Sequence, residues 1–342
     1  MNTEWQNFLI SKKAVFEDGK TVHYGNMGEE IHQSSTGHIM TDLSHTGLIS
    51  AQGNDASSFL QGQLTNDINQ VTLSNAQLSA YCSPKGRVLA LLLIYKQNQN
   101  RYLQVSEELI EPTLKRLKMF IMRSKVTLED CTDQFIKLGL SGADCEQKIK
   151  KIFTDIPTTE YATSQHDQLT IIRLPGIHPR FELIGNNLKE MKKIWSTLSQ
   201  EFIPAGYSAW DLTNIQAGIP TLYSTTSDKF IPQMINLDEL NAINFKKGCY
   251  VGQEVIARVK YLGKVKRRMY QASIESTFTP QAGDMIYSKS HDTTIGTVVS
   301  AQPENEKKQA LLISVKEEFT ENGNIYLENS QKKWPLKLVT KN

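Results

Sequence analysis

The chain has 342 residues, which is enough for two or three domains with cores of their own. Its 38 lysines and arginines nearly balance 36 aspartates and glutamates, and the resulting net charge of +2 argues against a protein built around a nucleic-acid backbone. Hydrophobic residues make up 39% of the chain and charged residues 22%, as in an ordinary soluble globular protein.

Neither the N-terminus nor any later window carries the apolar run of a signal peptide or of a membrane-spanning helix, which needs about 20 residues. The four cysteines, Cys82, Cys131, Cys145 and Cys249, are scattered without a C-x-x-C pair. Such cysteines are typical of reduced thiols in the cytoplasm, and no spacing of cysteine and histidine favours a metal site. We therefore expect a cytoplasmic protein with no membrane segment and no stably bound metal.

The first forty residues mix glycine, serine, threonine and histidine, and we expect them to be irregular, with ordered structure from about Gly47. Beyond that point, alternating or continuous apolar runs predict strands, and apolar residues at helical spacing predict helices. The elements expected in this first part are strands over residues 48–53, 77–83, 88–95, 101–105 and 125–128, and helices over residues 56–61 and 110–121.

A similar order of elements then recurs without obvious sequence repetition. Strands are expected over residues 134–140, 168–174 and 181–184, and helices over residues 142–152 and 188–198. Two successive patterns of this kind suggest two α+β modules of ferredoxin-like type, in which helices cover antiparallel sheets. We therefore predict the α+β class, with a first module over residues 1–130 and a second over residues 131–262.

The character of the sequence changes after Lys266, where helical stripes are absent. Short apolar segments separated by polar turns predict strands over residues 269–274, 285–287, 294–299, 310–315, 324–327 and 334–339. Short strands in such close succession suggest a small antiparallel β-barrel. We expect this barrel to form a third domain over residues 263–342.

The densest chemistry of the sequence lies between Phe230 and Arg268. Lys246 and Lys247 precede Gly248 and Cys249, and eight lysines or arginines face a single acid between residues 246 and 268. Nearby ammonium groups favour a thiolate over a thiol, and glycines beside the thiol let a ligand approach closely. Composition alone favours the other interpretation, a small buried cysteine within a solvated charged segment.

The order of these residues is more specific than their composition. The motif K-K-G-C-Y-V-G-Q-E at residues 246–254, followed by A-R and K-Y-L-G and preceded by F-I-P-Q, resembles the signature of the YgfZ family. That family is the bacterial branch of the folate-binding YgfZ and glycine-cleavage T-protein superfamily. The resemblance implies two related α+β domains and a C-terminal barrel around a central opening, with Cys249 as the functional thiol.

Two further segments resemble the superfamily and imply cofactor contacts. The first is L-Q-G-Q-L-T-N-D at residues 60–67, and the second runs from Trp210 to Pro220 with I-Q-A-G-I-P at its end. The implied cofactor is a weakly bound tetrahydrofolate, with contacts from Trp210, Gln216, Asn66 and Arg258. The indole of Trp210 would stack on the pterin.

Two departures from the family pattern imply weaker folate binding. T-proteins and many YgfZ members carry glutamate where this chain has Gln216, and an amide forms weaker hydrogen bonds than a carboxylate to a guanidine-like edge. Some relatives also have tryptophan where this chain has Thr46, so one stacking surface is lost.

A third departure concerns the reaction. T-proteins resemble the segment from Ser83 to Leu91 but carry a pair of acids in place of Ala90 and Leu91. One-carbon transfer to tetrahydrofolate needs a carboxylate that manages charge or protons at the reacting nitrogens, and neither residue can supply it. We therefore expect no aminomethyltransferase activity.

The interpretation we favour is a folate-binding accessory factor for iron–sulfur proteins, including tRNA methylthiolating enzymes of the MiaB type. One alternative is a folate-dependent one-carbon transferase, which Ala90 and Leu91 argue against. A second alternative is a direct tRNA-binding protein that uses the basic stretch, which the low net charge argues against. The expected partners are reduced folate and iron–sulfur client proteins, with no strong direct nucleic-acid binding, and the expected state is a monomer.

Overall fold

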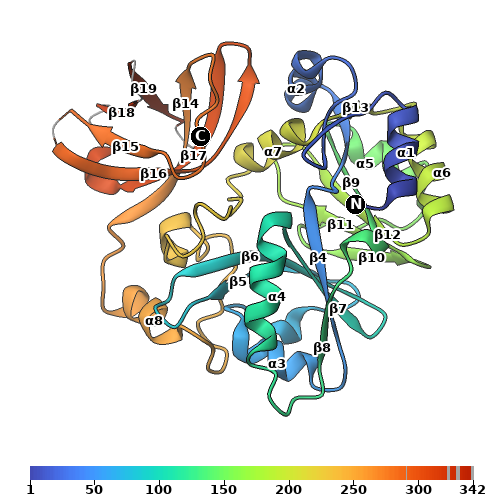
Figure 1. Cartoon of the computed structure of the whole chain (residues 1–342), viewed down its shortest axis with the longest axis horizontal. Helices are drawn as coiled ribbons and strands as arrows, with labels where there is room; N and C mark the ends of the chain where they lie inside the picture. Colours follow the sequence, from blue (N-terminus) through green and yellow to red (C-terminus); the bar gives the residue numbers. More distant parts are fainter. Residues whose placement is uncertain (290, 322–323, 329–331, 340–342) are drawn as a thin grey trace. The chain divides into compact units, whose positions relative to one another are not determined.

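The computed structural model describes residues 1–289, 291–321, 324–328 and 332–339 of the chain (Figure 1). These residues group into two compact units, and both units are interrupted in sequence. The first unit comprises Met1–Ala56, Asn69–Gln77 and Leu93–Thr213, and the second comprises Ser57–Ile68, Leu78–Leu92 and Asn214–Asn342. Each unit therefore draws on segments that are far apart in the chain.

The first forty residues are ordered, so the prediction of an irregular start is wrong. Both helices of this region begin at an asparagine: the side chain of Asn2 accepts a hydrogen bond from the backbone of Trp5, and Asn26 accepts one from Glu29. Such caps satisfy amide groups that a helix start leaves unpaired. The elements are α1 (Thr3–Ser11), β1 (Val15–Glu17), β2 (Lys20–His23), α2 (Met27–Thr36) and β3 (His38–Asp42).

A six-stranded sheet lies at the centre of the first unit, with the order β10-β11-β12-β9-β3-β13. β13 pairs with β3 in parallel, and the other neighbours are antiparallel. Its strands beyond β3 are β9 (Ile136–Gly142), β10 (Thr163–His166), β11 (Leu169–Leu174), β12 (Arg180–Gly185) and β13 (Ile203–Ala205).

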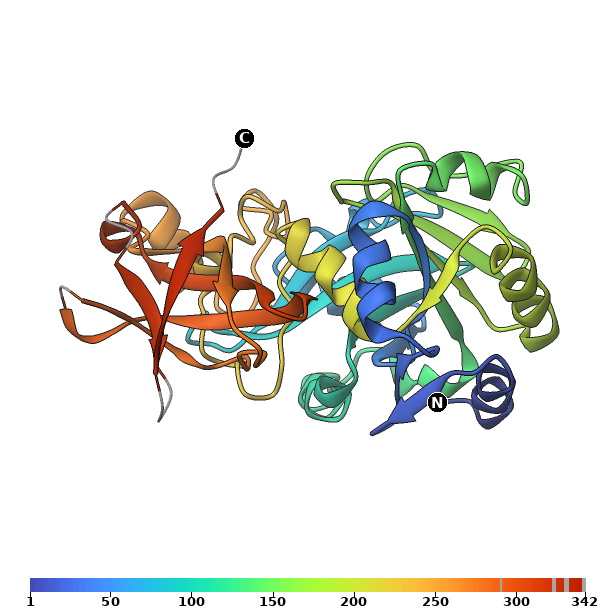
Figure 2. The same ribbon diagram turned by 90° about the horizontal axis from the view of Figure 1, so that it is seen from above.

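The two faces of this sheet differ in chemistry. The core of the first unit contains Leu138 and Leu140 of β9, Phe181 and Leu183 of β12, and buried side chains of α1, α5 (Cys145–Lys150) and α6 (Leu188–Leu198). Figure 2 shows the ribbons of these helices beside the sheet. Alternate residues of a strand point to opposite faces. The intervening positions of β9 and β12 therefore face away from the helices, and three of them carry charged side chains: Lys137, Arg180 and Glu182.

A five-stranded sheet has the order β5-β6-β7-β4-β8. Helix α4 packs on β4 and β8. The strands are β4 (Thr46–Gln52), β5 (Gln77–Cys82), β6 (Val88–Gln97), β7 (Asn100–Ser106) and β8 (Thr127–Asp130), and the helices between them in sequence are α3 (Ala56–Gln63) and α4 (Ile110–Lys118).

Part of the second unit is a closed antiparallel barrel with the order β14-β17-β16-β15-β18-β19. Buried aliphatic side chains such as Ile274, Leu311 and Ile313 fill it. Its strands are β14 (Arg267–Glu275), β15 (Met285–Ser288), β16 (His291–Asn305), β17 (Lys308–Lys316), β18 (Ile325–Glu328) and β19 (Lys333–Leu338).

Two α-helices and five 3₁₀ turns complete the described chain. The helices are α7 (Tyr207–Gln216) and α8 (Gln253–Tyr261), and the 3₁₀ turns are η1 (Ile68–Gln70), η2 (Glu107–Leu109), η3 (Thr132–Gln134), η4 (Pro232–Ile235) and η5 (Glu317–Phe319). No helix among the described residues is long and apolar enough to cross a membrane.

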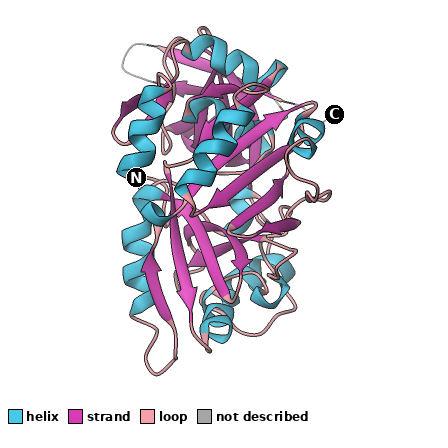
Figure 3. Cartoon of the chain, turned by 90° about the vertical axis from the view of Figure 1, so that its right-hand side faces the viewer, coloured by secondary structure: helices cyan, strands magenta, loops and turns pink. Residues whose placement is uncertain are grey.

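The mixture of helices and sheets, together with the C-terminal barrel, confirms the predicted α+β class (Figure 3). The predicted domain boundaries after residues 130 and 262 stay a prediction. Residues 340–342, the last of the third predicted domain, lie outside the described residues.

Candidate functional site

Cys249 lies on a loop of the second unit, residues 244–252, which we call the thiol loop. Its side chain is exposed, whereas Cys82, Cys131 and Cys145 are buried. Burial raises the pKa of the Cys131 thiol to about 12, and it also raises the pKa of Cys82 and of Cys145. A thiolate is the reactive form of cysteine, so Cys249 is the thiol that a reagent or partner can reach.

Lys247 holds the thiol loop to the end of helix α3. Its ammonium group donates hydrogen bonds to the backbone carbonyls of Gln61 at 2.8 Å, Leu64 at 2.7 Å and Asn66 at 2.8 Å. The ammonium also lies 5.3 Å from the ring centroid of Tyr250. Burial lowers the pKa of Lys247 to about 8, against an opposing effect of Asp67, so the group is mainly protonated at pH 7.

The L-Q-G-Q-L-T-N-D segment, residues 60–67, packs against residues 241–244, which lead into the thiol loop. The hydroxyl of Thr65 donates to the carbonyl of Ala242 at 2.7 Å, and the backbone amide of Asn244 donates to the carbonyl of Thr65 at 3.0 Å. The side-chain amide of Asn66 donates to the carbonyls of Asn241 and Leu78, both at 2.8 Å. Asn66, predicted to bind the cofactor, is thus engaged in holding the loop.

Gly252 ends the thiol loop in a left-handed conformation, with φ +83°. A Cβ atom built there would lie 2.6 Å from the carbonyl oxygen of Ser83 and 3.0 Å from the Cα of Gly86. Gly86 is itself left-handed, with φ +67°, and its own Cβ would lie 2.9 Å from the Cβ of Val255. The turn between β5 and β6 therefore touches the start of α8 through two glycines, and a side chain at either would push them apart.

Half of the eight basic side chains between residues 246 and 268 have partners within the chain. Lys247 is bound as described, Arg258 pairs with Glu254 at 2.6 Å, and Arg268 binds Asp238 through two hydrogen bonds. Lys260 lies over the ring of Phe245 at 5.4 Å. Arg258, predicted to bind the cofactor, is an exposed member of a pair within one helix, which is a weak interaction that an anion can displace.

A buried polar cluster lies in the first unit, on the charged face of the six-stranded sheet. Lys137 of β9 and Arg180 and Glu182 of β12 are each only 1% exposed. The ammonium of Lys137 donates to the carbonyl of Thr46 at 2.8 Å, and the amide of Gln104 donates to Glu182 Oε2 at 3.2 Å. Buried charges are costly unless they are paired or serve a site, so this cluster is a candidate for ligand binding.

The electrostatics of the cluster centre on Glu182. Burial raises the pKa of Glu182 to about 7, although Gln104, Lys137, Arg180 and His45 oppose the shift. Burial likewise lowers the pKa of Lys137, and lowers that of Arg180 to about 10. Among the described residues, Glu182 Oε1 and Gln104 Oε1 are buried acceptors with no hydrogen-bond donor.

The sequence prediction missed this cluster, although a signal was present. Lys137 and Glu182 interrupt the apolar runs that predicted the strands over residues 134–140 and 181–184. A single charged residue within such a run looks like a solvated edge, because sequence alone does not show that both charges share one buried face.

Trp210 and Gln216 both lie on helix α7. The indole of Trp210 is 4% exposed, it lies against Gly139, and the guanidinium of Arg180 sits over it at 4.3 Å. A pterin could stack on this ring only after the guanidinium moves. The backbone carbonyl of Gln216 accepts a hydrogen bond from Gln271 at 2.7 Å.

The remaining sequence candidates lie on β6 and at the start of β4. Ala90 is fully buried on β6, next to the partly buried Leu91. Thr46 uses its hydroxyl to donate to the carbonyl of Leu43. His45, which precedes β4, lies 3.7 Å from Asp211 Oδ1 through Nε2.

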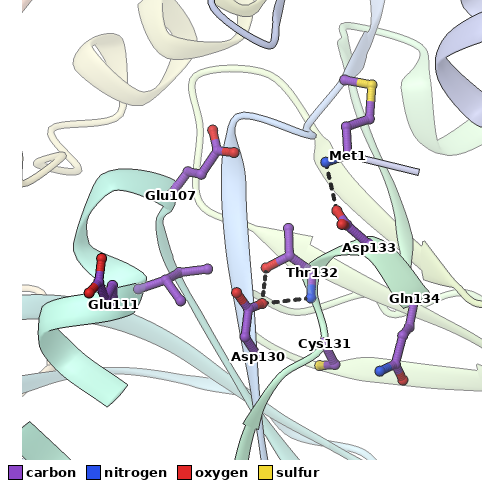
Figure 4. A pocket seen from close by; sticks show the side chains of 9 residues that line it. Met1, Glu107, Glu111, Asp130, Cys131, Thr132, Asp133 and Gln134 are labelled. Atoms are coloured by element: carbon purple, nitrogen blue, oxygen red, sulfur yellow. Dashed lines mark hydrogen bonds and ion pairs between the residues drawn. The ribbon is translucent and has the colours of Figure 1, made fainter. Parts of the chain in front are cut away.

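A pocket of about 380 Å³ in the first unit is a separate feature (Figure 4). Four carboxylates line it, from Glu107, Glu111, Asp130 and Asp133, and the terminal ammonium of Met1 binds Asp133 at 2.6 Å. Such a pocket disfavours a folate, whose glutamate tail is negatively charged. Among the described residues, no group of three or more His, Cys, Asp or Glu is arranged to hold a metal ion.

The two glycines of the thiol loop provide a matched pair of substitutions. Gly252→Ala places a Cβ against Ser83 and forces a left-handed alanine, so we expect it to lower the free energy of unfolding by about 1 kcal/mol or more. Gly248→Ala meets no atom within 4 Å and should change stability by less than about 0.5 kcal/mol. Denaturant unfolding of both variants measures the difference, and equal stability would contradict the close contact described here.

Comparison with known proteins identifies the family of this chain. The family described as GCVT N-terminal domain matches residues 11–247. Proteins named tRNA-modifying protein YgfZ are similar to this chain: that of Colwellia psychrerythraea is 34% identical, with 72% of this chain and 75% of the relative covered, and that of Photorhabdus laumondii is 31% identical, with 72% and 74% covered.

A solved structure confirms the fold. The aminomethyltransferase T of the glycine cleavage system from Bartonella henselae superposes with a TM-score of 0.82, covering 99% of this chain and 97% of that one, at 14% identity. At this identity the likeness concerns the fold alone. The matched family and the YgfZ relatives together show that the chain belongs to the YgfZ family of GCVT-type proteins.

Proposed function

We propose that this protein is a folate-binding accessory factor that supports iron–sulfur enzymes of tRNA modification, with Cys249 as its working thiol. The observation that carries the proposal is the contrast among the cysteines, since only Cys249 is exposed and its loop is fixed by backbone contacts. In this proposal the protein acts in the cytoplasm as a monomer, and its clients are tRNA methylthiolating enzymes.

The buried polar cluster supports the folate part of the proposal. The edge of a pterin presents an amino group and a ring N–H, which are donors for a carboxylate. Glu182 Oε1 and Gln104 Oε1 are buried acceptors that lack a donor among the described residues. We therefore propose that Glu182 takes the pterin edge, a role that the sequence had led us to place at Gln216. Displacement of the Arg180 guanidinium would then expose the Trp210 ring for stacking.

The pKa of Glu182 gives this assignment a pH dependence. Two donors on the ligand need the ionised carboxylate, whereas free Glu182 titrates near pH 7. Tetrahydrofolate affinity should therefore fall as pH drops below 7, by up to about tenfold per pH unit, because the carboxylate must first lose its proton. Anaerobic titrations at pH 5.5 to 8, followed by tryptophan fluorescence, measure this profile.

Glu182→Gln should bind more weakly at pH 8 and lose the pH dependence, because an amide does not titrate. Glu129→Gln, which changes an exposed carboxylate, is the matched control and should keep the native profile. The assignment is wrong if Glu182→Gln retains both the affinity and the pH profile of the unmodified protein.

The role of Cys249 is tested in a strain that lacks the endogenous protein. Cys249→Ser should leave the fold intact, because the side chain is exposed, yet fail to restore activity of an iron–sulfur tRNA-modifying enzyme. Cys131→Ala removes a buried thiol instead and should restore activity if it folds. Full rescue by Cys249→Ser would reduce this residue to a structural one.

One assay distinguishes a one-carbon transferase from the accessory factor proposed here. It measures the formation of methylene-tetrahydrofolate when an aminomethyl-loaded carrier protein is the donor. We expect no turnover, because Ala90 and Leu91 supply no carboxylate on β6. Turnover at an enzyme-like rate, about 1 per second or faster, would favour the transferase over the accessory factor.

A further inference from the structure

The side chain of Lys247 uses all of its hydrogen-bonding capacity on backbone carbonyls. An ammonium group has three N–H donors and no acceptor. The three donors of Lys247 meet three carbonyl oxygens, of Gln61, Leu64 and Asn66, at 2.7 to 2.8 Å. These acceptors lie 181 to 186 positions away in the sequence, so the contacts join two distant segments.

The position of these carbonyls explains why a cation fits there. Helix α3 ends at Gln63, so the carbonyl of Gln61 is one of its last carbonyls, which have no partner within the helix. The carbonyls of Leu64 and Asn66 follow directly. Cationic side chains near a helix C-terminus satisfy such carbonyls and interact favourably with the helix dipole. Lys247 therefore closes the end of α3 from a loop elsewhere in the chain.

We propose that Lys247 is a positioning residue for Cys249: its ammonium fixes the thiol loop to the end of α3 and does not activate the thiol. The sequence suggested activation, because the two residues are close neighbours in the motif. In the structure the donors of the ammonium are directed at carbonyl oxygens, whose negative ends offset its charge. This proposal rests on the proposed function only for the claim that the Cys249 thiol is the working group.

The surroundings of Lys247 agree with a fixed position. Asp67 is the charged group that acts on the ammonium from the α3 side, and the Tyr250 ring lies beneath it on the loop side. The parallel contact from Asn244 to Thr65 ties the start of the same loop to the same segment. Removing the ammonium leaves three part-buried carbonyls with fewer donors, which is costly.

The test compares Lys247→Met with Lys246→Met, its exposed neighbour in the motif. Hydrogen exchange of backbone amides in residues 61–68 and 244–252 reports how firmly the loop is held. We expect exchange in both segments to be at least about tenfold faster in Lys247→Met, and changed by less than about threefold in Lys246→Met. Lys247→Arg keeps the charge and two or more donors, so it should recover part of the protection.

The rate at which Cys249 reacts with a neutral disulfide at pH 7 separates positioning from activation. Activation by charge predicts that the rate falls in both Lys247→Met and Lys246→Met while amide exchange stays native, and this result would overturn the proposal. Native exchange in Lys247→Met would overturn it as well. If Lys247→Met does not fold, Lys247→Gln replaces it, with the same exchange criterion deciding the outcome.

Complementation distinguishes failure of this proposal from failure of the proposed function. Full rescue by Cys249→Ser refutes the proposed function and leaves the exchange result standing. Rescue by Lys247→Met equal to the unmodified protein, alongside no rescue by Cys249→Ser, refutes the positioning role alone.

Discussion

The thiol loop depends on a hydrogen-bonded junction between two segments about half the chain apart. Thr65 and Asn66 bind residues 241–244, and carbonyls in the last turn of α3 and just after it bind Lys247. Each such bond contributes about 1 kcal/mol, and bonds to a charged donor contribute more. The same contacts explain why two separate sequence motifs occur in one chain: the first motif is the surface on which the second is held.

A different constraint governs the first unit, where a sheet buries two cations and a carboxylate on the face opposite its helices. Burying a charge costs several kcal/mol unless partners compensate it. The hydrogen bonds of Lys137 and Glu182 compensate part of this cost. One carboxyl oxygen of Glu182 and the amide oxygen of Gln104 still have no donor among the described residues. A structure that only needed stability would replace these groups with aliphatic ones, so their presence favours a ligand that completes the set.

Sequence patterns predicted the barrel strands and most of the sheet strands within a few residues, because alternation and apolar runs report local burial directly. The first forty residues were missed because short helices rest on single caps such as Asn2 and on packing of Trp5 into a distant core. The glycines beside Cys249 indicated that a ligand can approach its thiol, and the side chain is exposed. The contacts of Lys247 could not be predicted, because its partners are backbone carbonyls that carry no sequence signature. Glu182 was missed because its ionic neighbour Lys137 and its hydrogen-bond partner Gln104 come from other strands.

The central claim is that the fold presents one reachable thiol on a fixed loop and buries the other three. The direct measurement treats the native protein with a maleimide at pH 7 and maps the adducts by mass spectrometry over time. We expect a single adduct at Cys249, with Cys82, Cys131 and Cys145 labelled only after unfolding. Labelling of any buried cysteine at a rate comparable to that of Cys249, or no labelling of Cys249, would contradict it.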